Sequence, residues 1–141
     1  MSPQRVLVVD DEESLLTIIS YALESAGFEV ATATDAEQAA ELIDKFEPNL
    51  LVLDVMLPGQ SGLDLCREVR NKTDIPIIIV SAKSEEVDKI LGLELGADDY
   101  VTKPFSPREL VSRVRAQLRR QEGSLVRAPN VIEIRNLKID C

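Results

Sequence analysis

Ionisable and hydroxyl side chains stand at the ends of several short apolar segments of the chain. Asp10 and Asp11 follow the first apolar segment, and Asp54 follows another. Ser81 follows a further apolar segment, and Lys103 stands at the end of the last. Carboxylates, a hydroxyl and an ammonium are groups that can hold a divalent cation and position a phosphoryl group. They can do so only if the fold brings them together.

The elements that must position these residues alternate along the chain. Short apolar segments predict buried strands, and segments with apolar residues every three or four positions predict amphipathic helices. The expected strands are residues 5–9, 28–33, 49–54, 75–80 and 99–103. The expected helices are one ending at Gly27, then residues 36–46, 63–70, 84–95 and 107–120. The apolar stripe of the first helix is expected at Leu15, Ile18, Ile19, Ala22 and Leu23.

This order of elements predicts the fold class. Strand and helix alternate five times, and most strands are apolar throughout, as a sheet covered on both faces requires. We therefore expect an α/β fold, a (βα)5 doubly wound parallel five-stranded sheet. Cys66 should face the core from the third helix.

The carboxyl ends of parallel strands share one edge of the sheet, so the acidic residues should converge there. Two carboxylates 4 Å apart repel by about 1 kcal/mol in water and by about 4 kcal/mol at an effective dielectric constant of 20. Lys103 supplies one positive charge, and Mg²⁺, which prefers oxygen ligands, would supply the rest. Taken singly, Asp11 or Asp54 could cap a helix and Lys103 could be a solvated charge. Their convergence instead predicts an acidic Mg²⁺ pocket that neutralises a phosphoryl group.

Composition excludes several classes of function. The chain has 141 residues, 45% of them hydrophobic, no histidine and two cysteines, which excludes a Cys/His zinc site and histidine acid–base catalysis. Aromatic residues are 4% of the chain, which argues against a surface that stacks on nucleic-acid bases. The net charge is −9, so the chain should be repelled by nucleic acid and by anionic membranes. No segment has the features of a signal peptide or a membrane span, which predicts a cytoplasmic protein.

Four motifs resemble one known family. They are Val8-Val-Asp-Asp-Glu12, Leu53-Asp-Val-Met-Leu-Pro-Gly59, Val80-Ser-Ala82 and Val101-Thr-Lys-Pro-Phe105. Together, over residues 4–121, they resemble the receiver domain of bacterial two-component response regulators. The segments 92–100 and 103–110 narrow the resemblance to the OmpR/PhoB-like subfamily. The resemblance implies a receiver domain at residues 1–122 with a flavodoxin-like strand order, 2-1-3-4-5.

The resemblance also implies a role for each acidic residue. Asp54 would be the phosphoacceptor and would take a phosphoryl group from the phosphohistidine of a sensor histidine kinase. Asp11, Asp54 and the backbone carbonyl of Met56 would bind Mg²⁺, and Asp10 would act mainly through a bound water. The protein would then be a signalling domain and not an enzyme that turns over a substrate.

The same resemblance implies a switch next to the phosphoacceptor. Lys103 would hold one phosphoryl oxygen, and Ser81 would move to donate a hydrogen bond to another. Tyr100 would turn inward into the space that Ser81 leaves. The Lys103–Pro104 peptide would be cis, which would direct the lysine into the site.

A surface on the fourth and fifth helices is the expected response element. By resemblance, it forms a symmetric homodimer through the fourth helix, the fifth strand and the fifth helix. The expected ion pairs across the two-fold axis are Lys89 with Glu109, Asp99 with Arg113, and Asp98 with Arg120. Ile90, Leu93 and Val111 would form the apolar centre. The simpler alternative is a solvated face whose ion pairs contribute about 0–1 kcal/mol each.

The last residues have a different pattern. Residues 131–140 alternate apolar and polar side chains, as half-buried antiparallel strands do. We expect residues 123–141 to be a linker and the first strands of a truncated C-terminal effector domain, although these strands could instead pack on the first domain. The resemblance implies a winged-helix module, so DNA would bind only through the missing part.

Three other interpretations fit the sequence less well. A phosphatase of the haloacid-dehalogenase type needs an Asp two residues after the nucleophile, where this chain has Met56. A flavodoxin-like cofactor binder needs a first loop rich in Gly, Ser or Thr, and the acidic loop 10–13 would repel a phosphate without a metal. A scaffold with a degenerate pocket is disfavoured because Asp11, Asp54 and Lys103 are all present.

Overall fold

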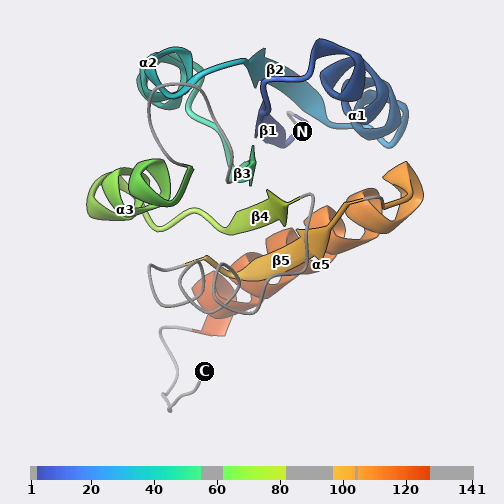
Figure 1. The fold of residues 1–141 in the computed structure, drawn as a ribbon. Helices are drawn as coiled ribbons and strands as arrows, with labels where there is room; N and C mark the ends of the chain where they lie inside the picture. The colour runs from blue at the N-terminus through green and yellow to red at the C-terminus, as the bar shows by residue number, and fades with distance from the viewer. Residues whose placement is uncertain (1–2, 55–61, 82–96, 104, 128–141) are drawn as a thin grey trace.

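The structure is a computed structural model that describes residues 3–54, 62–81, 97–103 and 105–127. Its elements are β1 (Arg5–Val9), α1 (Glu13–Ser25), β2 (Glu29–Ala33), α2 (Ala36–Phe46), β3 (Leu50–Asp54), α3 (Gly62–Lys72), β4 (Ile77–Ser81), β5 (Asp99–Thr102) and α5 (Pro107–Arg127). The strands form one sheet in the order β2-β1-β3-β4-β5, and every pair is parallel (Figure 1). The predicted doubly wound fold is confirmed. The expected helix 84–95 and the strands in 131–140 lie outside the described residues.

Two hydrophobic clusters cover the two faces of the sheet. On one face, α2 and α3 pack against alternate residues of the strands, among them Leu7, Leu51 and Ile77. On the other face, α1 and α5 pack against the intervening residues, among them Val8 and Val52. Successive strand residues point to opposite faces, so β1, β3 and β4 must be apolar throughout to be covered on both sides. Cys66 is fully buried in the first cluster, as predicted.

The edge strand β2 departs from the continuous apolar pattern. Only its last residue, Ala33, is buried, whereas Glu29 and Thr32 are exposed. As the outermost strand it pairs with β1 alone, so it needs less apolar surface than the central strands. It begins at Glu29, one residue after the expected start.

Helix α1 buries a narrower stripe than the sequence predicted. Leu16, Ile19 and Leu23 are buried, whereas Ile18 is 51% exposed and Tyr21 is 74% exposed. The placement of Ile18 in the stripe was therefore wrong. At 100° per residue, Ile18 is turned about 200° from Leu16 around the helix axis, so the two cannot share one buried face.

The helix starts follow local side-chain chemistry. Asp35 caps α2 by accepting the Gln38 N–H at 2.8 Å, and Ser106 accepts the Glu109 N–H at 3.0 Å just before α5. Helix α5 begins at Pro107 as predicted but ends at Arg127 rather than at residue 120. A helical glycine such as Gly123 costs about 1 kcal/mol relative to alanine, which is too little to end a helix. Among the described residues, the helices include none long and apolar enough to cross a membrane.

Candidate functional site

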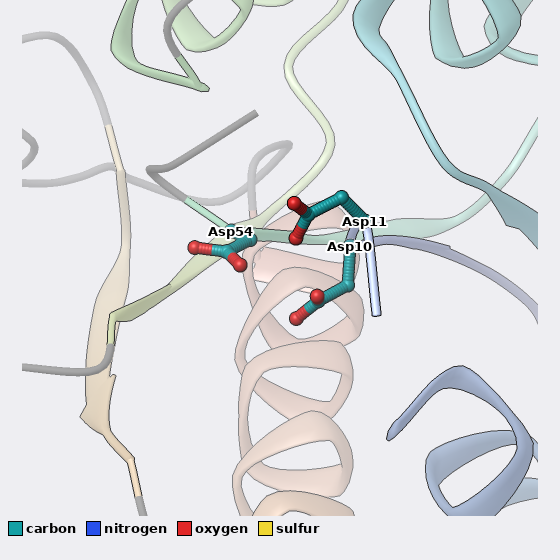
Figure 2. Close-up of side chains that lie close together, drawn as sticks. All are labelled: Asp10, Asp11 and Asp54. Carbon is teal, nitrogen blue, oxygen red and sulfur yellow. The ribbon is translucent and has the colours of Figure 1, made fainter. Parts of the chain in front are cut away.

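The sheet brings Asp10 and Asp54 side by side. Strands β1 and β3 are parallel neighbours, with Val9 opposite Leu53, so the residue after each stands at the same edge. Figure 2 shows the side chains of Asp10, Asp11 and Asp54 gathered there. Each of the three offers a carboxylate oxygen, and these oxygens all lie within 4.8 Å of one another. The predicted convergence of acidic side chains is confirmed.

Lys103 reaches this group from the end of β5. Its Nζ lies 2.9 Å from Asp10 Oδ2 and 3.1 Å from Asp54 Oδ2. The two aspartate side chains are only 3% and 4% exposed, and the ammonium offsets part of their negative charge. Burial by itself lowers the pKa of Lys103, but hydrogen bonds and charges of Asp10 and Asp54 outweigh it and raise the pKa above 10.5. Lys103 is therefore positively charged throughout the physiological pH range.

Glu12 is a further contact that the sequence analysis did not assign. Its carboxylate accepts a hydrogen bond from Lys103 Nζ at 3.3 Å, and its backbone N–H donates to Asp10 Oδ1 at 2.9 Å. The N-cap residue of α1 is Glu12, and within the described part of the chain no hydrogen bond involves the exposed Asp11 carboxylate. The signal was present in the sequence, because Glu12 directly follows the aspartate pair.

The charges of the described residues at this site do not balance. Among them, four carboxylates (Asp10, Asp11, Glu12 and Asp54) face one ammonium, and Asp10 and Asp54 are buried. Repulsion between buried carboxylates is stronger than between solvated ones, because the surrounding dielectric constant is lower. A hard divalent cation with oxygen ligands fits both the donor atoms and the excess negative charge. The arrangement can therefore bind a metal ion and hold a polar anionic group beside Lys103.

Other predicted site residues are placed only in part. Ser81 is the last residue of β4, paired with Thr102, so its backbone is at the same edge, although its side chain is not among those described. Met56 and Pro104 lie outside the described residues. Tyr100 is 9% exposed and belongs to the cluster on the α2–α3 face. Its ring is therefore already directed into the protein.

The predicted dimer surface contains ion pairs within one chain. Arg113 contacts Asp99 at 2.8 Å and Glu109 at 3.4 Å. Val111, expected at the centre of the interface, is 8% exposed and belongs to the core cluster of α1 and α5. Arg120 is exposed, whereas Lys89, Ile90 and Leu93 lie outside the described residues. These observations leave the dimer a prediction.

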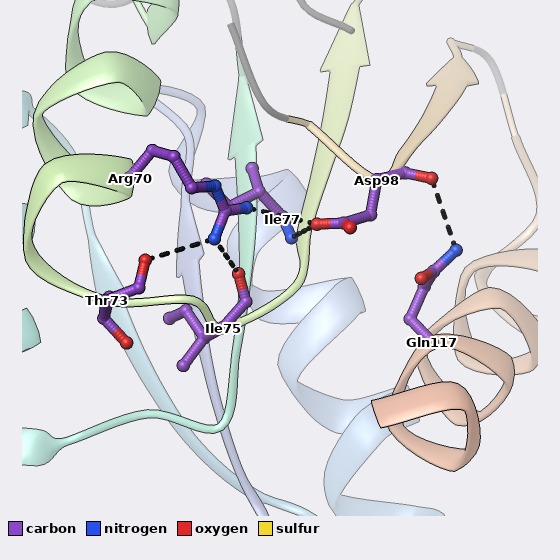
Figure 3. A network of polar contacts seen from close by, with 6 residues as sticks. All are labelled: Arg70, Thr73, Ile75, Ile77, Asp98 and Gln117. Atoms are coloured by element: carbon purple, nitrogen blue, oxygen red, sulfur yellow. Dashed lines mark hydrogen bonds and ion pairs between the residues drawn. The ribbon is translucent and has the colours of Figure 1, made fainter. Parts of the chain in front are cut away.

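Asp98 belongs to a second charged network, at the opposite edge of the sheet (Figure 3). Its carboxylate accepts hydrogen bonds from Arg70 Nη2 at 3.1 Å and from the Ile77 N–H at 2.9 Å. Arg70 Nη1 also donates to the carbonyl oxygens of Thr73 and Ile75. Gln117 Nε2, on the buried side of α5, contacts the Asp98 carbonyl at 3.4 Å. The network joins α3, β4, β5 and α5.

Comparisons with known proteins agree with this geometry. Residues 6–115 match the family model of the response regulator receiver domain. A CheY-like receiver domain protein from Methanospirillum hungatei JF-1 superposes with a TM-score of 0.83 at 30% identity, over 87% of this chain and 99% of that one. The BeF3-activated N-terminal receiver domain of Klebsiella pneumoniae RstA has a TM-score of 0.79 at 34% identity, over 82% of this chain and 99% of that one.

A longer protein is also similar to this chain. Thermotoga maritima DrrB, described as an OmpR/PhoB homolog, has a TM-score of 0.78 at 35% identity, over 84% of this chain and 54% of its own. The family match spans most of the chain and contains Asp10, Asp11, Asp54 and Lys103. The chain thus belongs to the response regulator receiver domain family.

Proposed function

We propose that this receiver domain accepts a phosphoryl group on Asp54 from the phosphohistidine of a sensor histidine kinase. The observation that carries the proposal is the placement of a buried Asp54 carboxylate 3.1 Å from the Lys103 ammonium, beside two further aspartates. The description of the similar RstA domain as BeF3-activated supports it, because beryllofluoride is a tetrahedral anion of phosphoryl size.

In the transfer, an oxygen of Asp54 attacks phosphorus and forms a P–O bond. The P–N bond to the histidine breaks, its electron pair returns to the imidazole, and the ring takes a proton from solvent. Lys103 then exchanges part of its contact with Asp54 for a phosphoryl oxygen. Its raised pKa keeps the ammonium charged, so it opposes the negative charge that the phosphoryl group brings.

Asp10, Asp11 and Asp54 would hold Mg²⁺, with the Met56 carbonyl as the expected further ligand. The ion would neutralise the phosphoryl oxygens and the carboxylates at once. Asp54 would be both a ligand and the nucleophile. The Asp10 carboxylate, 2.9 Å from Lys103 Nζ, would keep the ends of β1 and β5 at a fixed separation.

Phosphorylation would change the α5 surface through Ser81 and Tyr100. We propose that Ser81 moves toward the phosphoryl group and that the ring of Tyr100, already buried, shifts further into the space that Ser81 leaves. Dimerisation through the fourth helix, β5 and α5 would then use Asp98, Asp99, Glu109, Arg113 and Arg120 together with Lys89, Ile90, Leu93 and Val111. Because Arg113 contacts Asp99 within one chain, a dimer must share or exchange this ion pair.

The effector function is proposed on the similarity to DrrB. That protein is longer than the matched region, and it is described as an OmpR/PhoB homolog. Residues 123–141 would lead into a winged-helix domain that binds DNA and regulates transcription in the cytoplasm. The chain itself, with its net charge of −9, should not bind DNA or a membrane surface.

The test is incubation with acetyl phosphate and Mg²⁺, followed by intact-mass measurement. Wild type should gain about 80 Da, the mass of one phosphoryl group, and Asp54→Asn should gain nothing. Asp64→Asn, which changes an exposed carboxylate on α3, is the matched control and should be phosphorylated like wild type. Rapid turnover of acetyl phosphate without a stable adduct would instead favour a phosphatase, and an adduct on Asp54→Asn would refute the assignment.

A further inference from the structure

The outer face of α5 carries three arginines in one line. Arg108, Arg115 and Arg119 are separated by seven and four residues, which places them within an arc of about 40° around the helix. All three are exposed. Within the described part of the chain, none has a hydrogen bond or an ion pair, whereas Arg5, Arg70 and Arg113 all have a carboxylate partner.

Two of these arginines line a cavity next to the end of α1. The cavity has a volume of about 260 Å³ and is lined by Gln4, Ala26, Gly27, Phe28, Arg115, Leu118 and Arg119. Gln4 and Phe28 immediately precede β1 and β2. The cavity therefore lies at the amino ends of the strands, away from the edge that carries Asp10 and Asp54. Figure 1 shows α1 and α5 covering the same side of the sheet.

A helix-capping role does not account for the two arginines. The C-terminal carbonyl groups of α1 can attract cations, but three of them have backbone partners. Ala22 O accepts the Ala26 N–H, Leu23 O accepts the Phe28 N–H at 3.1 Å, and Glu24 O accepts the Gly27 N–H at 3.0 Å. The guanidinium groups of Arg115 and Arg119 thus keep their donors for another acceptor.

The composition of the cavity defines the kind of ligand. Two guanidinium groups one helical turn apart match the oxygens of a phosphate or phosphonate, which arginine binds in a bidentate manner. Phe28, which is partly buried against the core, provides an apolar surface beside them, and Leu118, only 4% exposed, adds little to it. A volume of about 260 Å³ is below the range of drug-sized pockets, so the ligand must be small.

We infer that this cavity binds a small organic phosphate, with the phosphate between Arg115 and Arg119 and the organic group on Phe28. The site is separate from the phosphoacceptor site. It would allow a small metabolite-sized anion to bind the α1–α5 side of the domain. Because different residues form the two sites, the proposal stands or falls independently of phosphorylation at Asp54.

The test is NMR titration of the full chain with phenylphosphonate in the presence of EDTA. This probe has a P–C bond and cannot transfer its phosphorus group to Asp54. The expected result is saturable shifts of the Gly27 and Phe28 amide signals, with little change at Asp54. Methylphosphonate tests whether the anion alone suffices, and it should bind at least about tenfold more weakly because it lacks the group that covers Phe28.

Variants of exposed arginines complete the test. Arg115→Ala with Arg119→Ala should weaken phenylphosphonate binding by at least about tenfold, since two charged hydrogen-bond partners are lost. Arg108→Ala is the matched control, because Arg108 lies on the same face but not in the cavity, and it should bind like wild type. Equal weakening by both variants would show a general charge effect and overturn the proposal. So would shifts centred on Asp54, or the absence of saturation.

Discussion

Two charged clusters, at opposite edges of one sheet, have different balances of charge. At the edge formed by the carboxyl ends of the strands, the carboxyl edge, Asp10, Asp11, Glu12 and Asp54 face Lys103 alone among the residues that the structure describes. At the edge formed by the amino ends of the strands, the amino edge, Arg70 faces Asp98, and both also bond to backbone groups. The second cluster is complete within the chain, whereas the first has an excess of negative charge.

The difference separates a structural role from a binding role. A network whose charges balance and whose backbone groups have hydrogen-bond partners stabilises the fold and needs no ligand. An unbalanced cluster of buried carboxylates costs folding free energy unless a cation binds, and so is expected where ligand binding is required. Measuring stability with and without Mg²⁺ should therefore distinguish the two edges.

Loss of Lys103 should give the largest effect. In Lys103→Met, Asp10 and Asp54 remain buried without their ammonium, which should lower the free energy of unfolding by about 3 kcal/mol in EDTA. Mg²⁺ should restore part of this loss, because it supplies positive charge to the same carboxylates. Urea unfolding measures both effects.

The control is Lys45→Met. Lys45 contacts Glu41 at 3.1 Å, but the two side chains are 72% and 62% exposed, so the change should be below about 0.5 kcal/mol. An equally small change for Lys103→Met would mean that the carboxyl edge does not depend on its ammonium.

Loss of Asp98 should have the next largest effect. Asp98→Ala removes the partner of Arg70 and of the Ile77 N–H, so the free energy of unfolding should fall by about 2 kcal/mol. Unlike the loss of Lys103, this loss should be the same in EDTA and in Mg²⁺. Asp44→Ala, which removes an exposed ion pair with Lys72 at 3.5 Å, is the control and should change stability little. A strong Mg²⁺ dependence for Asp98→Ala would remove the distinction between the edges.

A smaller effect of opposite sign is expected at Asp11. Asp11→Asn removes one negative charge from the unbalanced cluster and should raise the free energy of unfolding by about 1 kcal/mol in EDTA. With saturating Mg²⁺ the gain should disappear, because the variant has lost a ligand. Asp74→Asn, at an exposed position between α3 and β4, serves as the control. If Asp11→Asn destabilises the protein in EDTA, the carboxylates do not repel one another as proposed.

The carboxyl edge was predictable and the amino edge was not. Asp10, Asp54 and Lys103 each end an apolar strand, and parallel strands carry such residues to one edge whatever the detailed packing. Arg70 and Asp98 are 28 residues apart, and each alone resembles a solvated charge. Their contact depends on how α3 leads into β4, which periodicity does not describe.

Helix faces show the same limit. Periodicity located α1, but it placed Ile18 in the buried stripe because a 100° arc can be drawn through several sets of apolar residues. Val111, which stays a predicted interface residue, is buried against the core within one chain, and only packing shows which side of α5 faces α1. For α1 the element was predicted and the direction of one side chain was not.

The last expected effect concerns Cys66, which lies beside the amino-edge network. Burial raises the pKa of its thiol above 9.0, Arg70 lowers it and Asp98 raises it. A raised pKa means that the folded state holds the thiol proton more tightly than the unfolded state, so the stability from this group is complete below pH 9 and falls as pH rises further.

The burial of Cys66 can be measured by labelling in a Cys141→Ser background. A thiol reagent at pH 8 should label Cys66 at least about a hundredfold more slowly than the unfolded chain, because labelling requires opening of the core. Asp98→Ala should accelerate labelling by loosening α3, whereas Asp11→Asn, at the other edge, should slow it in EDTA. Acceleration by both variants would show that the two clusters do not act as separate regions of the fold.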